Sequence, residues 1–380
     1  MLEINALSDD VLRLILQTLP VRELIRLKPL ICTRWKLLIG QIMLTTTELH
    51  FYEFRHEVKA VNRAISERNF DIRLDETVLL LNKTDPEGFD PSKALLLPTL
   101  FPNVKIFGFS FKESIESKIP LLIDQWSANL TVLIMSELPK SEETLQQFWK
   151  TLVTLSKLTN LTFIRTFRHP IPSAIYPILN QLTNFSLVHY LSDLVPILSQ
   201  LTTIKELSIH WVYLSAEQMA KAIEQNSNLK QLEMLYIGFI FSQNGDREKN
   251  YQHLFWFICQ NFKALKKLDN QYGDQLDLSD IIHGLSELTS LAELWIYVGR
   301  HQLKQADLSS LPQLHSVKIL RLEIFELTVE QFFTFTSRTF PNLEQLILRA
   351  PDFDATQQRT VLSRLSEAFP NLKMKKIKFA

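Results

Sequence analysis

The chain has 380 residues, of which 46% are hydrophobic and 22% are charged, a composition typical of a folded globular protein. Its 41 basic and 41 acidic side chains cancel, so there is no overall field that would steer it to nucleic acid or to an anionic membrane. Leucine fills 65 positions but glycine only 8, which leaves little room for phosphate-binding loops.

The cysteines and the apolar stretches indicate the cellular compartment of the protein. Cys32 and Cys259 stand alone, which excludes a disulfide framework and a cysteine-rich zinc site. The N-terminus does not read as a signal peptide, and the longest uncharged stretch, residues 170–192, contains prolines and several polar side chains. We therefore expect a reducing compartment, cytoplasmic or nuclear, with no membrane or nucleic-acid partner and no cofactor.

Three short helical patterns occupy residues 7–39. Ser8 begins the first, whose apolar stripe ends at Pro20, the second covers residues 23–27, and the third passes through Trp35. Three short helices make a marginal core, which a partner or a neighbouring domain usually completes.

Two phrases in this segment resemble an F-box. The family's opening Leu-Pro-x-Glu-Val-Leu-x-x-Ile-Phe is matched by LSDDVLRLIL at residues 7–16, and its closing Val-Cys-Lys-Arg-Trp by ICTRW at residues 31–35. Ser8 replaces the family's proline, Thr33 its lysine, and there is an extra residue near Pro29. The resemblance predicts a three-helix F-box over residues 1–43 that docks a Skp-family adaptor and, through it, a cullin. It places these residues at the adaptor interface or its support, unless they only pack among themselves: Leu7, Val11, Ile15, Leu16, Leu19, Leu24 and Trp35.

Residues 44–100 are expected to form an irregular connection or the first repeats, with a strand within residues 44–54. After them one phrase recurs, Phe-Pro-Asn followed by an aliphatic residue, at residues 101–104, 340–343 and 369–372. Weaker copies give aliphatic anchors at these positions: 104, 130, 161, 185, 204, 229, 265, 291, 317, 343 and 372. The anchors at 265, 291, 317 and 343 are each 26 residues apart, which indicates an internal repeat.

Each anchor opens the pattern L-x-x-L-x-L, which predicts a short strand with one buried face. Capping boxes then predict helices that begin after Ser215, Thr328 and Asp354. One strand and one helix per 26 residues resembles a leucine-rich repeat over residues 101–380. The resemblance implies an α/β solenoid shaped as a horseshoe, with a parallel sheet on its concave face and helices on its convex face.

Positions 3, 5, 7 and 8 of each repeat should point to the concave face, because strand side chains alternate. Counting from the anchors predicts a target-binding set there: Phe163, Phe167, His189, His210, Trp211, Glu233, Tyr236, Trp295 and Tyr297. An error of register would instead place several of these aromatic residues in the core. Acidic residues recur on the same predicted face and suggest a basic stripe on the target: Glu206, Glu233, Glu293 and Glu323.

Motifs for catalysis or for metal binding do not occur in the sequence. The nine histidines are scattered, with no H-E-x-x-H, no G-x-S-x-G and no nucleotide-binding fingerprint. The leading hypothesis is a non-catalytic substrate-recognition subunit of an SCF-type ubiquitin ligase, as the two resemblances imply, whose repeats bind a target protein. The alternative is a stand-alone leucine-rich-repeat scaffold whose N-terminal helices are a cap.

Overall fold

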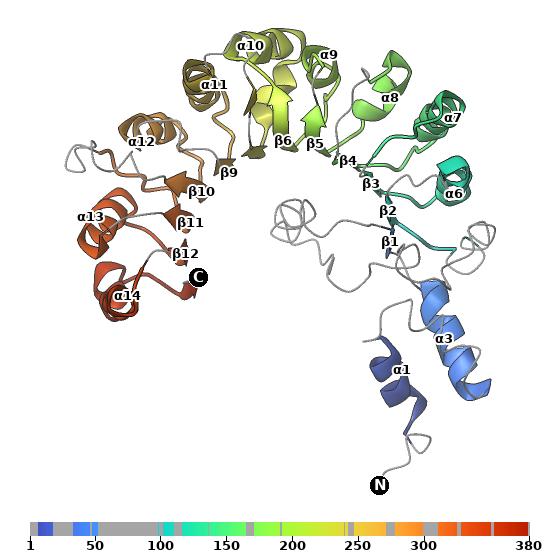
Figure 1. Cartoon of the computed structure of the whole chain (residues 1–380), viewed down its shortest axis with the longest axis horizontal. Helices are drawn as coiled ribbons and strands as arrows, with labels where there is room; N and C mark the ends of the chain where they lie inside the picture. The colour runs from blue at the N-terminus through green and yellow to red at the C-terminus, as the bar shows by residue number, and fades with distance from the viewer. Residues whose placement is uncertain are drawn as a thin grey trace. The chain divides into compact units, whose positions relative to one another are not determined.

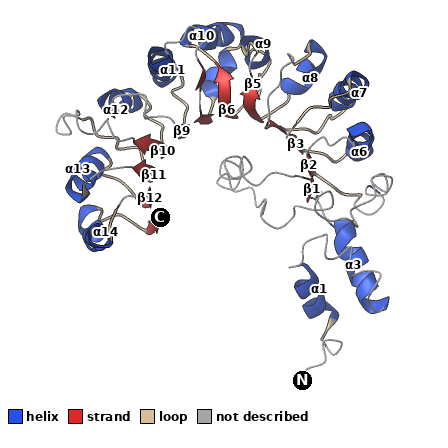
Figure 2. Ribbon diagram, viewed as in Figure 1, coloured by secondary structure: helices blue, strands red, loops and turns tan. Residues whose placement is uncertain are grey.

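A computed structural model describes most of the repeats and part of the N-terminal segment. The described residues are 7–17, 33–45, 48–51, 98, 102–109, 116–135, 137–164, 171–190, 192–238, 240–241, 247–270, 278–298, 311–324, 328–350 and 353–378. The chain divides into two compact units, one of residues 1–166 with 171–178 and the other of residues 167–170 with 179–380. In each unit the strands follow one side and the helices the other (Figures 1 and 2).

The first unit carries the N-terminal helices and the first repeats. Its helices are α1 (Asp9–Gln17), α3 (Thr33–Thr45), η3 (Glu116–Lys118), α6 (Ile119–Trp126), α7 (Glu142–Val153) and η4 (Ser173–Ile175), and α8 (Tyr176–Leu179) follows directly. Its strands are β1 (Glu48–Phe51), β2 (Ile106–Phe109), β3 (Val132–Met135) and β4 (Asn160–Phe163), paired in parallel in that order. β1 lies within residues 44–54, where a strand was expected.

The second unit continues the alternation of strand and helix. Its parallel strands, in spatial order, are β5 (Asn184–Tyr190), β6 (Glu206–Tyr213), β7 (Met234–Ile237), β9 (Lys267–Asn270), β10 (Glu293–Val298), β11 (Ile319–Ile324), β12 (Gln345–Arg349) and β13 (Met374–Lys378). The two-residue β8 (Ile240–Phe241) also pairs with β6. Its helices are α9 (Val195–Leu198), α10 (Ala216–Gln225), η5 (Ser227–Gln231), α11 (Arg247–Asn261), α12 (Leu278–Ser286), α13 (Val329–Thr339) and α14 (Ala355–Ala368).

The core follows from the L-x-x-L-x-L pattern. Leu294 and Ile296 of β10 are fully buried, and the strand register places them beside Leu320 and Leu322 of β11. In β9 the sixth position is Asn270, whose side-chain oxygen accepts a hydrogen bond from the buried Tyr251 hydroxyl. A polar residue is tolerated in this core row because its oxygen is satisfied.

Caps and turns set the repeat boundaries. All three predicted capping boxes are confirmed, at Ser215, Thr328 and Asp354, where each side chain accepts from the amide three residues later. The asparagine before the anchor ties successive turns, since Asn129 donates to the Pro102 carbonyl at 3.3 Å and Asn342 to the His315 carbonyl at 2.9 Å. Neighbouring turns are thereby held in register without using strand side chains.

The register corrects three of the predicted anchors. Leu161 lies opposite Leu133, which is the fourth position of its own repeat, so the first position is Leu158. Phe185 and Leu235 both pair with Leu207, which is a fourth position, so the first position moves back from 185 to 182 and forward from 229 to 232. The remaining predicted anchors within the described strands keep their assignment.

Candidate protein-binding surfaces

The first candidate surface is the helix pair α1–α3. Arg34 of α3 holds the pair together, because its guanidinium forms an ion pair with Asp9 at 2.6 Å and donates to the Leu7 carbonyl at 2.6 Å. Arg13 donates to the side chain of Gln41 at 2.7 Å. Both helices therefore have polar ties along their contact as well as buried leucines and isoleucines.

The apolar residues of α1 divide between two faces. Leu12 and Leu16 are fully buried, whereas Val11 and Ile15 are 41% and 38% exposed. Leu16 thus supports the helix pair from inside, and Leu7 and Trp35 are half-buried. Leu19 and Leu24 lie outside the described residues.

Two further apolar side chains on this helix pair were not in the predicted set. Leu14 of α1 is 64% exposed and Leu37 of α3 is 65% exposed. The signal for Leu14 was present in the sequence, since apolar residues at 11, 12, 14, 15 and 16 cover more than one face of a helix. Of the seven large apolar side chains that are exposed among the described residues, four lie on α1 and α3.

The second candidate surface is the open face of the second unit, which we define as the side of its strands opposite the core rows. The register places three rows across it. One row runs through Glu206, Met234, Lys267, Glu293, Ile319 and Gln345, and the next through Ser208, Tyr236, Asp269, Trp295, Arg321 and Ile347. The third includes His210 in β6 and Tyr297, Glu323 and Arg349 in β10–β12.

Two of the predicted aromatic residues are on this face but are covered. Tyr236 is fully buried and Trp295 is 6% exposed. Long basic neighbours lie against both rings, with the Lys267 ammonium 5.6 Å from the Tyr236 ring centroid and the Arg321 guanidinium 5.8 Å from that of Trp295. The expectation that these rings are open to a target is therefore corrected.

Internal ion pairs also neutralise most of the predicted acidic stripe. Glu293 forms ion pairs with Lys267 at 2.9 Å and with Arg321 at 3.2 Å, and all three side chains are less than one-fifth exposed. In the third row, Glu323 pairs with Arg349 at 3.0 Å. These carboxylates are already matched within the chain, so they do not indicate a basic target.

A row of charges also runs along the turns that enter the strands. Glu233, which the corrected register places just before β7, pairs with Lys266 at 2.8 Å, and this hydrogen bond lowers the pKa of Glu233. Near the C-terminal end, Glu344 lies between Lys373 and Lys318, at 2.6 and 3.3 Å, and their hydrogen bonds lower its pKa. The same residues line a shallow hollow of about 510 Å³ with Asn342 and Asn371.

Phe163 was also predicted to lie on the open face, but it does not. Phe163 is fully buried, because the corrected register makes it the sixth position of its repeat and its ring packs 6.4 Å from that of Trp149. Phe167 lies outside the described residues. The interpretation that an error of register would bury some of the set holds for Phe163.

The remaining predicted residues gather at the ends of β5 and β6. His189 and Trp211 stack with ring centroids 5.1 Å apart and an angle of 14° between the rings. Their backbones have φ values of 59° and 56°, in the left-handed region that residues other than glycine avoid. His210 lies directly on Gly238, where an added Cβ would overlap the imidazole. Sequence alternation alone placed these side chains on the face but gave no sign of the unusual backbone.

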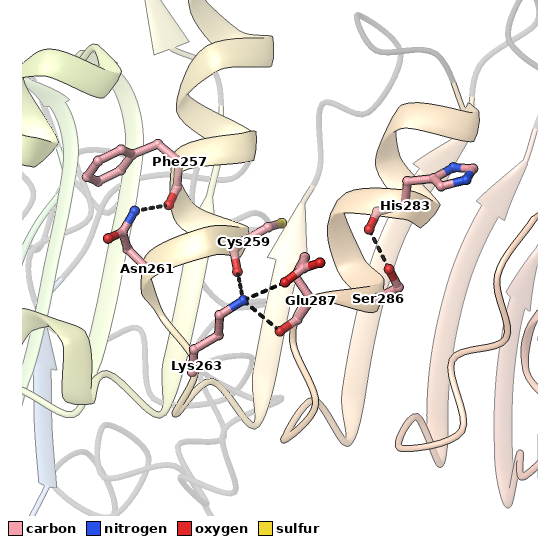
Figure 3. A network of polar contacts seen from close by, with 7 residues as sticks. All are labelled: Phe257, Cys259, Asn261, Lys263, His283, Ser286 and Glu287. Atoms are coloured by element: carbon pink, nitrogen blue, oxygen red, sulfur yellow. Dashed lines mark hydrogen bonds and ion pairs between the residues drawn. The ribbon is translucent and has the colours of Figure 1, made fainter.

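Lys263 links the ends of α11 and α12, and Ser286 makes a separate contact with the His283 carbonyl within α12 (Figure 3). The Lys263 ammonium donates to the carbonyls of Cys259 and Glu287 and to the Glu287 carboxylate, at 3.0–3.1 Å. The Cys259 thiol is buried, and burial raises its pKa, so it is held as an unreactive thiol. Gly284 lets the two helices approach, because a Cβ there would come within 2.8 Å of Phe255.

The described part of the chain contains neither a metal-binding cluster nor a membrane-spanning helix. Within it, no three histidine, cysteine or acidic side chains are placed to hold a metal ion. Among the described helices, none has the length and apolar character needed to cross a bilayer.

A family model described as a leucine-rich repeat region matches residues 128–380, well over half of the chain. The chain belongs to the leucine-rich-repeat proteins. Such regions are scaffolds that bind other proteins over an extended surface and are typically non-catalytic. The match does not reach the N-terminal helices of this leucine-rich-repeat protein, and no F-box is identified there.

Solved structures with the same kind of fold are distant in sequence. An internalin (InlF) of Listeria monocytogenes is 16% identical, with 75% of this chain and 70% of that chain covered and a TM-score of 0.34. The yeast complex of Rad7 and Elc1 gives 16% identity, coverage of 77% and 84%, and a TM-score of 0.43. A leucine-rich-repeat protein of Leptospira interrogans is 14% identical, with 73% of this chain and 77% of that chain covered and a TM-score of 0.24. No curated protein matches the sequence.

Proposed function

We propose that this leucine-rich-repeat protein is the substrate-recognition subunit of an SCF-type ubiquitin ligase. Its N-terminal helices dock a Skp-family adaptor that joins it to a cullin, and its repeats hold a target protein. The observation that carries the proposal is the cluster of exposed apolar side chains on α1 and α3, in the segment whose two phrases resemble an F-box: Val11, Leu14, Ile15 and Leu37.

Exposure of this cluster favours a docking role over a simple cap. A cap would turn its large apolar side chains toward the repeats, since burial of each contributes about 1.5–3 kcal/mol. Here Leu12 and Leu16 fill the contact between the helices, and the neighbouring apolar residues remain accessible. Val11, Leu14 and Ile15 are spaced by three and four residues, so they share one face of α1, and an exposed apolar face typically marks an interaction site.

The proposed role of the repeats is to supply proximity. A scaffold that holds a target beside a ubiquitin-loaded conjugating enzyme turns a bimolecular encounter into an effectively intramolecular one. No bond chemistry is required of the repeat protein itself.

The test is co-expression with a Skp-family adaptor followed by size-exclusion chromatography. We expect a one-to-one complex from the wild-type chain and its loss in Val11→Asp and Leu14→Asp, whose exposed positions should tolerate the change without unfolding. The matched control is Leu362→Asp on α14, which is 44% exposed and should retain the complex. A well-folded wild-type chain that forms no complex, or a complex that survives both α1 variants, would reject the proposal in favour of a stand-alone binding scaffold.

A further inference from the structure

Helix α3 contains a glycine well inside its length, at Gly40. Glycine within a helix is unfavourable relative to alanine, because it loses more conformational freedom on folding and adds no side-chain contact. The chain has only 8 glycines among its 380 residues, so one in the middle of a helix calls for a physical reason.

Two other glycines show what such a reason looks like in this chain. At Gly238 an added Cβ would lie 1.9 Å from the His210 ring, and at Gly284 it would lie 2.8 Å from the Phe255 ring. Each position has no room for a methyl group, because another part of the chain packs directly against the backbone. Glycine is therefore used at both places to allow a close approach.

Gly40 differs from both of these positions. A Cβ there would have no atom within 4 Å beyond its own stretch of helix. Alanine would fit the free chain without displacing any neighbour, and it would favour the helix. The free chain itself thus supplies no close approach that requires glycine at this position.

The place of Gly40 on the helix connects it to the exposed apolar cluster. The buried side of α3 is formed by Leu38, Ile39 and Ile42, whereas Leu37 is 65% exposed. Residues three apart are neighbours on a helix surface, so Gly40 lies beside Leu37. Gly40 is therefore continuous with the surface that carries the proposed function.

We propose that a segment of the Skp-family adaptor packs directly on the backbone of α3 at Gly40, beside Leu37. The inference rests on the proposed function and adds to it a residue that sets how closely the adaptor can approach. Glycine lacks the Cβ that would hold the two chains apart, so the adaptor can reach the helix backbone and cover Leu37 at the same time. The glycine that is unfavourable in the free helix is then compensated by contacts in the complex.

The experiment compares two properties of Gly40→Ala, and they should change in opposite directions. In the free chain we expect slower amide hydrogen exchange across α3, because alanine stabilises the helix and meets no neighbour. In titration calorimetry with a purified Skp-family adaptor we expect binding to weaken by about tenfold or more, since a methyl group added to a close-packed contact forces the partners apart. Gly40→Leu should weaken binding further.

The matched control is Ser363→Ala on α14, which introduces alanine at an exposed helical position away from the cluster. It should leave the affinity for the adaptor within about twofold. The control shows that a change of helix propensity at an exposed position does not by itself alter binding.

Two results for Gly40→Ala would overturn the inference. One is an affinity within about twofold of the wild-type value, and the other is faster exchange across α3, which would mean that weaker binding reflects a damaged helix. An adaptor complex that Val11→Asp abolishes but Gly40→Ala leaves intact rejects only this inference. A folded wild-type chain that binds no adaptor rejects the proposed function and this inference with it.

Discussion

Phe163→Ala separates the two possible registers of the fourth strand. If Phe163 were a surface residue on the open face, as the sequence pattern suggested, its removal would change the free energy of unfolding by less than about 0.5 kcal/mol. In the structure its ring is fully buried and packs against Trp149, in the same core row as Phe109 and Met135. Truncation of a buried phenylalanine leaves a cavity and costs about 3–5 kcal/mol.

The measurement is urea unfolding followed by circular dichroism, with the shift of the midpoint read at constant slope. Leu121→Ala is the control in the same unit, because its side chain is 45% exposed and its loss should cost less than about 1 kcal/mol. A cost for Phe163→Ala no larger than that of the control would refute the corrected register. It would also return Phe163 to the set of candidate target-binding residues.

Two further predictions concern the ties between repeats. Lys263→Met should cost about 1 kcal/mol of unfolding free energy, because it removes the donor to the carbonyls of Cys259 and Glu287. The control, Lys221→Met on the exposed face of α10, should cost less than about 0.5 kcal/mol. Equal costs in urea unfolding would contradict the structural role of Lys263. Because its two lysine partners lower the pKa of Glu344, these ion pairs stabilise the fold above the unfolded value of 4.5 and are lost as the pH falls through the lower folded value. Glu344→Gln should therefore lower the urea midpoint at pH 7, by an amount that shrinks as the pH falls below 4.5. A difference that stays undiminished in acid would show that the charge is not its cause.

The parts of the fold that depend on local sequence could be predicted. Capping boxes are contacts between residues three apart, and the alternation of buried leucines is read directly from a strand. Both are confirmed, at Thr328 and Asp354 for the caps and at Leu294 and Leu320 for the strands. The 26-residue spacing likewise follows from local composition repeated along the chain.

The predicted register was wrong where the repeat pattern matches itself after a shift of three residues. Leu229, Leu232 and Leu235 are evenly spaced, so either of the first two can be taken as the start of L-x-x-L-x-L. The asparagine that marks the first position at Asn129 and Asn342 donates to a turn, but Asn160 and Asn184 lie in strands and precede the fourth position. Only pairing with a neighbouring strand distinguishes these uses of the same residue.

Burial on the open face depends on neighbours in other repeats and is not visible along one strand. Tyr236 and Trp295 were correctly placed on that face, yet Lys267 and Arg321 from adjacent strands lie over their rings. A row of aromatic and basic residues in the sequence is therefore compatible with either an open platform or a closed one. The distance between charged groups and rings decides between them.

The strained ends of β5 and β6 explain why this end of the sheet remains the better candidate for recognition. Each left-handed residue costs about 1–2 kcal/mol relative to ordinary strand geometry, and the stacking of the two rings returns about 0.5–1.5 kcal/mol. The stack by itself contributes less than the two left-handed residues His189 and Trp211 cost together. By contrast, the charges of Lys267, Glu293 and Arg321 are paired with one another within the chain. The two left-handed residues thus distinguish this part of the open face from the ion-paired part beside it, and such backbone outliers concentrate where proteins make functional contacts.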